Sequence, residues 1–499
     1  MGGRSKSIPE DAKTRLDADS PWQKYPSIFA GVGVACLLIA LVVGAFSGGS
    51  DHHGDDHGAP AEQHAEGGPD EAVQGSDDGH AGEAGHGSGD GHADEADHGS
   101  GDGHADEGGH GSGDGHAAED GHGSDHAAAN GAEAHGGEAH GHGPKNRFYY
   151  SYLTAYMYGL SLALGGLFFV LIQFLVKAGW SVVVRRIAEN VMGTLPLFAI
   201  LFVPLVFGFH DTHSHWWSVE PGVDSLLDGK RGYLNQPFFF VRAVVYFAIW
   251  IWLAQRFRKQ SVAQDESGDQ GITWKLQGLA PVGVILFGLT VTFAAIDWIK
   301  SMDPHWYSTM WGVYFFAGCL VAIFSSLAIL TLWLQRGGVL HKVINVEHYH
   351  DIGKLMFGFT VFWTYIAFSQ YFLIWYANIP EEQLWFEHRS HGGWREVGMF
   401  LAIGHFFVPF FFLIPRAIKR NPVTLFIGAA WLLFIHYVDI YFMIMPVYSH
   451  GFDPSVVDVL ALVGVVCLFL AAFARLSLSA DLVPRKDPRL PESLAFENF

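Results

Sequence analysis

A few titratable side chains lie inside long apolar stretches of this chain. His405 lies near the middle of one stretch, and His436 and Asp439 lie three residues apart in the next. Residues three apart share one face of a helix, so this pair should point in the same direction. Because a charged group in lipid costs free energy, these side chains should face the protein interior, where imidazole and carboxyl groups can relay protons.

The candidates for a proton pathway form two groups at opposite depths. The group expected near one membrane surface comprises Glu189, Asp351 and Lys354. The group expected toward the other surface comprises Arg242, Asp297, Gln370, His405, His436 and Asp439, with Tyr437 and Tyr441 beside the last pair. Each side of the membrane would then have access to titratable groups. The alternative is that these are packing residues with satisfied polar atoms, and that Asp297 reaches water at a helix end.

Ten apolar stretches must position these residues, and each is close to the roughly 20 residues that a membrane-spanning helix needs. The stretch after Asp351 shows the pattern, because a polar block is followed by an apolar run that ends at Ala377 before Asn-Ile-Pro. The sequence therefore predicts an all-α, polytopic membrane protein. The expected helices lie near Ile28–Phe46, Tyr152–Leu175, Ala188–Phe209, Pro237–Phe257, Gly278–Ile299, Ser308–Leu334, Gly353–Ala377, Arg395–Pro415, Val423–Met445 and Val456–Arg475.

The distribution of Lys and Arg predicts the orientation. If the N-terminus is inside, the inner connections carry 21 of these residues and the outer connections seven. Cytoplasmic loops are the ones enriched in Lys and Arg, so we expect both termini in the cytoplasm. The expected segments are a cytoplasmic start at 1–27, a first helix at 28–46, a periplasmic insert at 47–147, a nine-helix membrane domain at 148–476 and a cytoplasmic tail at 477–499. A cleaved signal peptide is the alternative for the first helix, although no clear small-x-small cleavage site precedes Asp51.

The insert has a composition unlike the rest of the chain. Residues 51–143 contain 23 Asp and Glu, 16 of the 28 His and no Lys or Arg, and they account for the net charge of −20. A twelve-residue unit recurs at 89–100, 101–112 and 113–124. With almost nothing apolar to bury, the segment should be disordered. It is either a solvated acidic spacer or a weak binder of Zn²⁺, Cu²⁺ or Ni²⁺. No basic patch with interleaved aromatic residues indicates a nucleic-acid partner.

Cysteine usage bears on cofactors. The three cysteines are far apart in apolar segments, and no Cys-x-x-Cys-His motif occurs. We therefore expect this chain to bind no haem or iron–sulfur centre. A metal site is conceivable at His213 and His215, but no further ligands can be assigned to it. Trp216 and Trp217 follow directly and favour an interfacial loop instead.

Three blocks of the sequence resemble a known family. They are RRIAENVMGTLPLFAILFVPLVFG at 185–208, DWIKSMDPHWYSTMWGVYFFAG at 297–318 and HDIGKLMFGFTVFWTYIAFSQYFLIWYANIPEEQLWF at 350–386. These blocks resemble ActF, a family of membrane subunits of alternative complex III that is related to the NrfD family. The resemblance covers residues 150–475, and the His-rich insert departs from it.

The resemblance implies two four-helix bundles with two further helices, no haem or iron–sulfur centre, and proton-conducting half-routes. The positions that lie inside matching blocks are Asp297, Asp303, His305, Asp351, Lys354, Gln370 and Glu381. The choice of His405, His436 and Asp439 rests on their depth in the membrane and not on the resemblance.

The expected function is that of an integral subunit of a quinol-oxidising respiratory complex in the inner (cytoplasmic) membrane of a bacterium. The chain would not be catalytic alone. Menaquinol or another quinol would be oxidised at a sister NrfD-like subunit, with an iron–sulfur subunit and multihaem and monohaem cytochrome c subunits as further partners. This chain would contribute a proton pathway or a quinone-related pocket. The alternatives are a zinc transporter, for which a His-rich loop is typical, and a purely structural membrane anchor.

Overall fold

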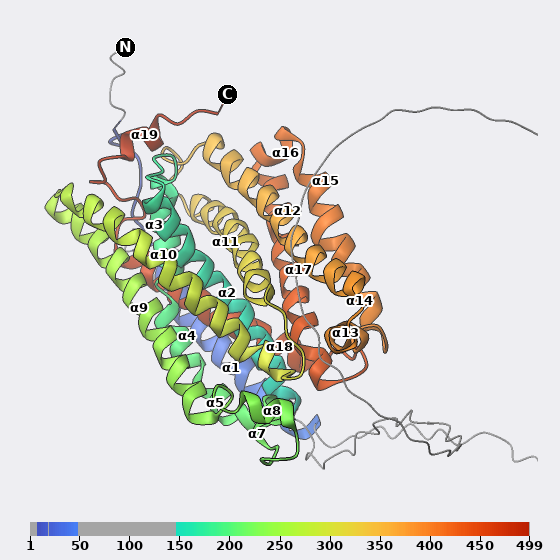
Figure 1. Cartoon of the computed structure of the whole chain (residues 1–499). Coiled ribbons are helices and arrows are strands. Elements are labelled where there is room, and N and C mark those ends of the chain that lie inside the picture. Colours follow the sequence, from blue (N-terminus) through green and yellow to red (C-terminus); the bar gives the residue numbers. More distant parts are fainter. Residues whose placement is uncertain (1–6, 18, 48–145, 499) are drawn as a thin grey trace, which may run out of the picture. The chain divides into compact units, whose positions relative to one another are not determined.

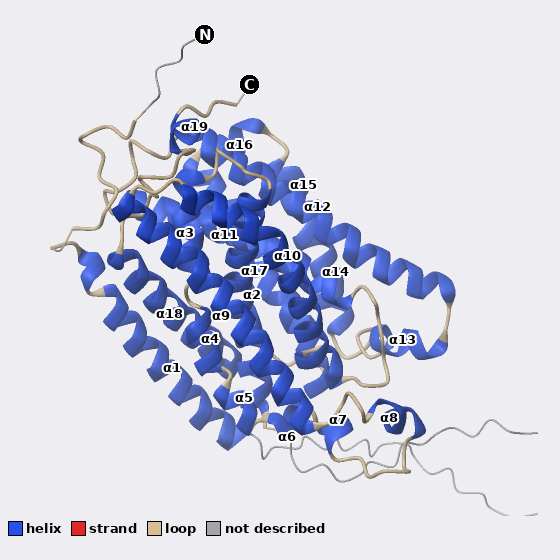
Figure 2. Cartoon of the chain, turned by 60° about the vertical axis from the view of Figure 1, so that its left-hand side comes forward, coloured by secondary structure: helices blue, strands red, loops and turns tan. Residues whose placement is uncertain are grey.

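The computed structural model describes residues 7–17, 19–47 and 146–498. These residues form helices and connecting loops, and no strand occurs among them (Figure 2). Ten helical segments of the described chain are long and apolar enough to cross a membrane. This confirms the prediction of an all-α polytopic fold, and the protein is a multi-pass membrane protein. The insert predicted at 47–147 falls almost wholly outside the described residues.

The membrane-spanning segments follow the predicted order. They are α1 (Tyr25–Ser47), α2 (Arg147–Leu175), the broken helix α3–α5 (Val182–Met192, Leu195–Leu201 and Val203–Phe207), α9 (Gln236–Ser267), α10 (Gly271–Trp298), α11 (Trp311–Arg336), α12 (Val346–Ala377), the broken helix α14–η3–α15 (Trp394–Leu401, Ala402–Phe407 and Val408–Leu413), α17 (Pro422–Tyr448) and α18 (Val456–Ser479). Short helices lie in the connections: η1 (Pro21–Gln23), α6 (Phe209–Thr212), α7 (Ser214–Trp217), α8 (Ser225–Lys230), η2 (Lys300–Met302), α13 (Pro380–Glu387), α16 (Arg416–Arg420) and α19 (Leu490–Leu494).

The long helices pack as two four-helix bundles and one pair. The first bundle consists of α2, α3–α5, α9 and α10, and the second bundle consists of α11, α12, α14–α15 and α17 (Figure 1). α1 packs along α18 as the additional pair. α2 contacts α11, α17 and α18 as well as its own bundle. It is therefore the helix that joins the three groups.

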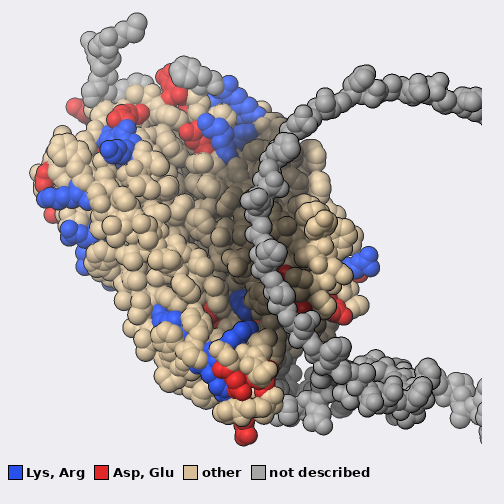
Figure 3. Space-filling model, viewed as in Figure 1, with Lys and Arg blue, Asp and Glu red and all other residues tan. Residues whose placement is uncertain are grey.

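The two ends of the bundles are distinct. α16 and α19 lie at one end of the bundles, which we call the proximal face, and α7 and α8 lie at the opposite end, the distal face (Figure 1). Charged side chains gather mainly toward these two ends, with a broad band of uncharged residues between them (Figure 3). This is the distribution expected for helices that cross a lipid layer.

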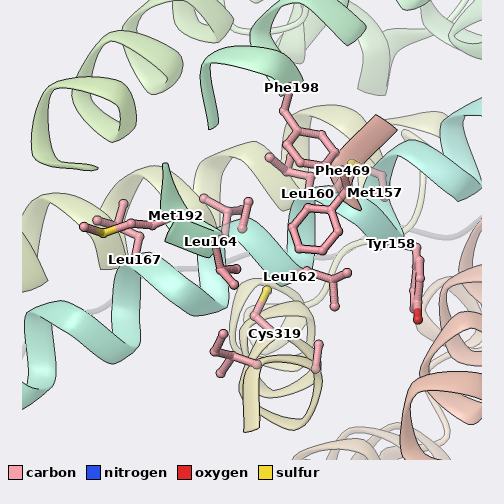
Figure 4. Packing of buried hydrophobic residues seen from close by; sticks show 14 of the residues in the cluster. Met157, Tyr158, Leu160, Leu162, Leu164, Leu167, Met192, Phe198, Cys319 and Phe469 are labelled. Carbon is pink, nitrogen blue, oxygen red and sulfur yellow. The ribbon is translucent and has the colours of Figure 1, made fainter. Parts of the chain in front are cut away.

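α2 and α11 form the inner core, where both helices are buried on nearly all sides. Side chains of the broken helix α3–α5, of α11 and of α18 pack around α2: Met192, Phe198, Cys319 and Phe469 (Figure 4). A side chain at Gly165 would collide with the Cys319 backbone, so this glycine allows α2 and α11 to approach closely. Cys319 is buried and unpaired, and it packs as a small apolar residue.

Some helices begin earlier than predicted, because polar residues near their ends are paired within the fold. α3 starts before the predicted Ala188, since Arg185 and Arg186 are buried in ion pairs. α12 starts before the predicted Gly353, at a point where the Asn345 side chain accepts hydrogen bonds from two backbone N–H groups. A hydropathy pattern ends at such charges, whereas a helix does not.

Candidate functional site

Asp439 of α17 is the centre of a polar cluster inside the second bundle. Its Oδ1 atom accepts a hydrogen bond from the Tyr314 hydroxyl group of α11, and its Oδ2 atom accepts one from the Trp363 indole of α12 at 3.0 Å. His405 of η3 lies against the Trp363 ring, with the ring centroids 3.6 Å apart. All four side chains are buried. We call Tyr314, Trp363, His405 and Asp439 the central cluster.

His405 lies in a π-helical turn. Pro409 follows four residues later and lacks the N–H group that would bond to the His405 carbonyl in a regular helix. The neighbouring Gly404 carbonyl accepts a hydrogen bond from Trp431 Nε1 at 2.7 Å. Among the described protein groups, neither ring nitrogen of His405 has a hydrogen-bond partner. The ring is thus held by packing, and its capacity to take or give a proton is unused. π-turns of this kind are frequent at functional sites.

His436 lies on α17 next to the central cluster but has other partners. Its Nε2 atom lies 2.9 Å from the Ser161 hydroxyl group of α2, which donates its own proton to the Tyr158 carbonyl at 2.7 Å. The Ser161 hydroxyl group thus holds the Nε2 side of the imidazole ring. A Cβ atom at Gly318 of α11 would lie 2.7 Å from the His436 ring, so glycine leaves the space for the imidazole. His436 thus sits where α2, α11 and α17 meet.

Arg242 and Asp297 form a separate site in the first bundle. Arg242 Nε and Nη2 donate to the two Asp297 carboxylate oxygens at 2.8 and 2.9 Å. The Tyr246 hydroxyl group donates to the same carboxylate at 2.8 Å, and the guanidinium group lies 3.8 Å from the Tyr233 ring centroid. Asp297 is fully buried and does not extend to water. This is a closed, fully paired ion pair with the geometry of a structural link between α9 and α10.

Tyr441 belongs to a third site, at the distal ends of α2 and α18. Its hydroxyl group donates to Asp458 Oδ2 at 3.0 Å. Arg147 pairs with the same carboxylate at 2.8 Å, and Ser151 donates to the other oxygen at 2.5 Å. Asp458 also caps its own helix through the Ser455 N–H group at 2.8 Å. Arg147 and Asp458, which the sequence pattern did not indicate as site residues, together tie two helix ends.

The candidates near the proximal face also separate into two sites. Glu189 is fully buried and pairs with Arg185 at 3.4 Å and with Arg186 at 2.8 Å. Asp351 pairs with Lys354 one turn further along α12, and the Lys354 side chain is 47% exposed. Among the described residues, no hydrogen bond or ion pair joins Glu189 to Asp351 or Lys354. The predicted single group near this face is therefore divided.

The predicted group near the other surface is divided as well. Arg242 and Asp297 bind each other in the first bundle, whereas His405, His436 and Asp439 gather in and beside the central cluster. Gln370 lies on the buried face of α12, two turns beyond Trp363. In the part of the chain that the structure describes, its Oε1 atom has no hydrogen-bond partner. Sequence reasoning missed the side chains that hold the acids and histidines: Ser161, Tyr314 and Trp363.

Three further histidines, His213, His215 and His305, lie at the distal face. His213 stacks on Phe209 with ring centroids 5.0 Å apart, and burial lowers the pKa of His213 to about 3, so the ring is neutral. His215 Nδ1 lies 2.7 Å from the Met302 carbonyl oxygen. His305 Nε2 donates to Asp224 at 2.6 Å. Within residues 7–17, 19–47 and 146–498, no three His, Cys, Asp or Glu side chains form a group that could hold a metal ion.

Comparisons with known proteins add no relative on which to base an assignment. No family model matches this chain, and no curated protein is similar to it in sequence.

Proposed function

We propose that this chain is an integral membrane subunit of a quinol-oxidising respiratory complex of the alternative complex III type, and that its central cluster is part of a proton pathway. One observation carries the proposal. A carboxylic acid, Asp439, is held inside an apolar bundle by donors from two other helices, with His405 and His436 beside it. An ionisable group at such a depth is costly and is expected where protons or ions move. The three sequence blocks that resemble ActF suggest the kind of complex.

Polar groups extend from the central cluster toward the proximal face. α11 runs from Trp311 at its distal end to Arg336 at its proximal end, and it carries Ser325, Ser326 and Thr331 in buried positions. Among the described protein groups, the hydroxyl groups of these three residues have no hydrogen-bond partner. Buried hydroxyl groups of this kind are suited to binding water. These hydroxyl groups, with the water that they bind, would connect His436 to the proximal face.

Toward the distal face, Gln370 of α12 would continue the pathway. Its buried amide lies beyond Trp363 on the same face of α12. Asp439 would take a proton from one direction and release it in the other, and His405 and His436 would act as the neighbouring donors and acceptors. The Tyr314 and Trp363 hydrogen bonds hold the Asp439 carboxyl group in place between α11 and α12.

The remaining parts of the proposal follow from the expected complex. The chain binds no redox centre of its own, and electrons leave quinol at a sister membrane subunit beside iron–sulfur and haem-bearing partners. The membrane is the cytoplasmic membrane of a bacterium, with the proximal face in the cytoplasm and the distal face in the periplasm. The excess of Lys and Arg in the connections of the proximal face supports this orientation.

Purification of the full-length chain from its native membrane tests the proposal. A tag on the chain should bring down iron–sulfur and c-type haem proteins together with a second polytopic subunit, and the preparation should reduce cytochrome c with added quinol. A chain that elutes without any haem protein, from membranes with intact quinol oxidation, would contradict the proposal. Uptake of radioactive zinc by vesicles that contain the chain alone would contradict it in favour of a transporter.

A further inference from the structure

The short helix α16 brings positive side chains together with the first turns of α12 at the proximal face. It connects α15 to α17 and packs against α12. Arg420 of α16 binds Glu347 of α12 through both carboxylate oxygens, at 2.7 and 2.6 Å. The Lys419 side chain lies against Gly353, where a Cβ atom would meet it at 2.8 Å. Lys and Arg side chains gather at this end of the molecule (Figure 3). We call four of them the proximal basic cluster: Lys354, Arg416, Lys419 and Arg420.

The positive charges of the cluster exceed the carboxylates that bind them. Glu347 and Asp351 are each paired with one of the four cations. In the part of the chain that the structure describes, Arg416 and Lys419 form no ion pair with a carboxylate. Arg416 donates to the Asn498 carbonyl at 3.4 Å. Lys419 is 6% exposed and donates to two carbonyls at the end of α15, at 2.5 and 2.8 Å. Two positive charges of the cluster are therefore left without a carboxylate.

His350 of α12 lies among these charges. Its side chain is 7% exposed, and the charges of all four members of the cluster act on its ring. Among the described protein groups, its Nδ1 atom has no hydrogen-bond partner. A buried polar atom without a partner loses the hydrogen bond that it would make to water, so it favours a ligand that supplies one. A negatively charged group that accepts hydrogen bonds would satisfy both His350 and the excess of positive charge.

An apolar surface that faces lipid begins directly beside the cluster. Lys354 is followed on the same side of α12 by Gly358 and Val361, and all three are exposed. A side chain at Gly358 would meet no atom within 4 Å, so the surface is open there. On α15, which contacts α12, Phe411 and Ile414 are exposed as well. A ligand with acyl chains can lie along these two helices while its headgroup stays at the cluster.

The orientation of the chain does not by itself explain the cluster. Lys and Arg are common at the cytoplasmic ends of membrane helices, where their long side chains usually extend into water. Lys419 is instead buried and held by backbone carbonyls, and it shares its surroundings with a buried histidine. Positive charges that only set the orientation need not converge on one place.

We propose that the proximal basic cluster binds the phosphate headgroup of an anionic phospholipid. The phosphate oxygens would accept hydrogen bonds from Arg416 and His350, Lys419 would add its charge, and the acyl chains would lie along α12 and α15. A zwitterionic lipid fits less well, because its own positive group is repelled by the cluster. The proposal rests on the membrane-spanning fold and not on the complex to which the chain belongs.

The test titrates lipid into the delipidated full-length chain in neutral detergent micelles, and native mass spectrometry counts the bound lipid. The probes are dioleoylphosphatidylglycerol and dioleoylphosphatidylcholine, which differ in their headgroups alone. A Lys or Arg residue close to an anionic lipid surface contributes about fivefold in affinity. With two charges that lack a carboxylate, phosphatidylglycerol should bind about tenfold more tightly than phosphatidylcholine, or tighter still.

Two variants locate the site. Arg416→Gln removes one charge without breaking an ion pair, so it should raise the Kd of phosphatidylglycerol about fivefold and leave that of phosphatidylcholine unchanged. His350→Phe keeps the ring shape and removes the nitrogens, and it should raise the Kd of phosphatidylglycerol about tenfold, the effect of a hydrogen bond to a charged group. Arg256→Gln is the matched control, because Arg256 is an exposed arginine of α9 in the first bundle. Circular dichroism checks that each variant is folded.

Equal affinities of the unaltered chain for the two lipids would overturn the proposal. So would equal effects of Arg416→Gln and Arg256→Gln, which would show a general attraction to positive charge and no site. Competition with sn-glycerol 3-phosphate distinguishes a lipid from a free phosphate ester. At a concentration equal to that of phosphatidylglycerol it should displace none of the lipid, and displacement would assign the cluster to a soluble phosphate ester instead.

Discussion

The ion pair between Arg242 and Asp297 makes a strong prediction about stability. Asp297→Asn keeps the shape of the side chain and removes its charge. Asp297 has no exposed surface and Arg242 is 7% exposed, so the guanidinium group would be left buried without a carboxylate. Removing one partner of a buried pair typically costs about 3–5 kcal/mol. The Tyr233 carbonyl, which accepts from Arg242 Nη1 at 2.9 Å, and the Tyr233 ring remain as partners.

We therefore expect the lower end of that range, about 3 kcal/mol, which is a change of about a hundredfold in the unfolding equilibrium. The assay is reversible unfolding of the purified chain in mixed micelles, followed by circular dichroism. The double variant Arg242→Gln/Asp297→Asn removes both charges, so it should be more stable than Asp297→Asn alone. The reasoning fails if Asp297→Asn changes the stability by less than about 0.5 kcal/mol, or if the double variant is the less stable of the two.

Three further predictions concern other parts of the fold. Gly318→Ala places a Cβ atom against the His436 ring and should cost about 1–3 kcal/mol in the same unfolding assay. Asn345→Ala removes the capping side chain of α12 and should cost about 1 kcal/mol. The hydrogen bond from His305 lowers the pKa of Asp224 below its ordinary value of 3.8. This hydrogen bond should therefore stabilise the distal loops above pH 3.8 and be lost as the pH falls through the lowered pKa of Asp224. Amide hydrogen exchange of α8 can measure the loss.

Each of these predictions has a control. Gly278→Ala in α10 meets no atom within 4 Å, so it should be neutral or slightly stabilising, and equal losses for Gly278→Ala and Gly318→Ala would contradict the steric argument. For α12, a loss that is not reversed in Asn345→Asp would show that capping is not the cause. Asp224→Asn should abolish the dependence of exchange on pH, once intrinsic rates are corrected. A dependence that persists in this variant would assign it to another group.

The fold could be predicted because the thickness of the lipid layer sets the length of each membrane-spanning helix. Each crossing needs about 20 apolar residues, and a helix satisfies its own backbone, so ten apolar stretches predict ten helices. The packing of the helices could not be read from periodicity. α2 is buried on nearly all sides and therefore has no polar face that would indicate its neighbours. The expected arrangement into two four-helix bundles came from the resemblance, and the contacts between helices agree with it.

The burial of His405, His436 and Asp439 could also be predicted, because charge in lipid is costly. Their partners could not. Tyr314 and Trp363 bind Asp439 from 125 and 76 residues away in the sequence, and aromatic residues are too common here to be distinctive. The expected grouping by depth failed for a related reason, since residues at one depth in different bundles need not meet.

Arg147 and Asp458 were missed because of their position. Each lies at the end of an apolar stretch, where a charged residue commonly reaches water or caps a helix. Arg147 is one of the seven Lys and Arg residues of the outer connections. Asp458 lies where Ser455 begins a capping box. In the fold the two side chains are buried and paired. A charge at a helix end is ambiguous until its neighbours across the bundle are known.

The proton-to-electron ratio of the assembled complex in sealed vesicles tests the central claim most directly. It should be compared between the unaltered complex and complexes that contain Asp439→Asn or Asp439→Glu, with quinol oxidation measured in the same vesicles. If the central cluster conducts protons, Asp439→Asn should lower the ratio while quinol is still oxidised, and Asp439→Glu should restore much of it. An unchanged ratio in Asp439→Asn, with the protein correctly folded, would show that the buried acid is a structural residue and not part of a proton pathway.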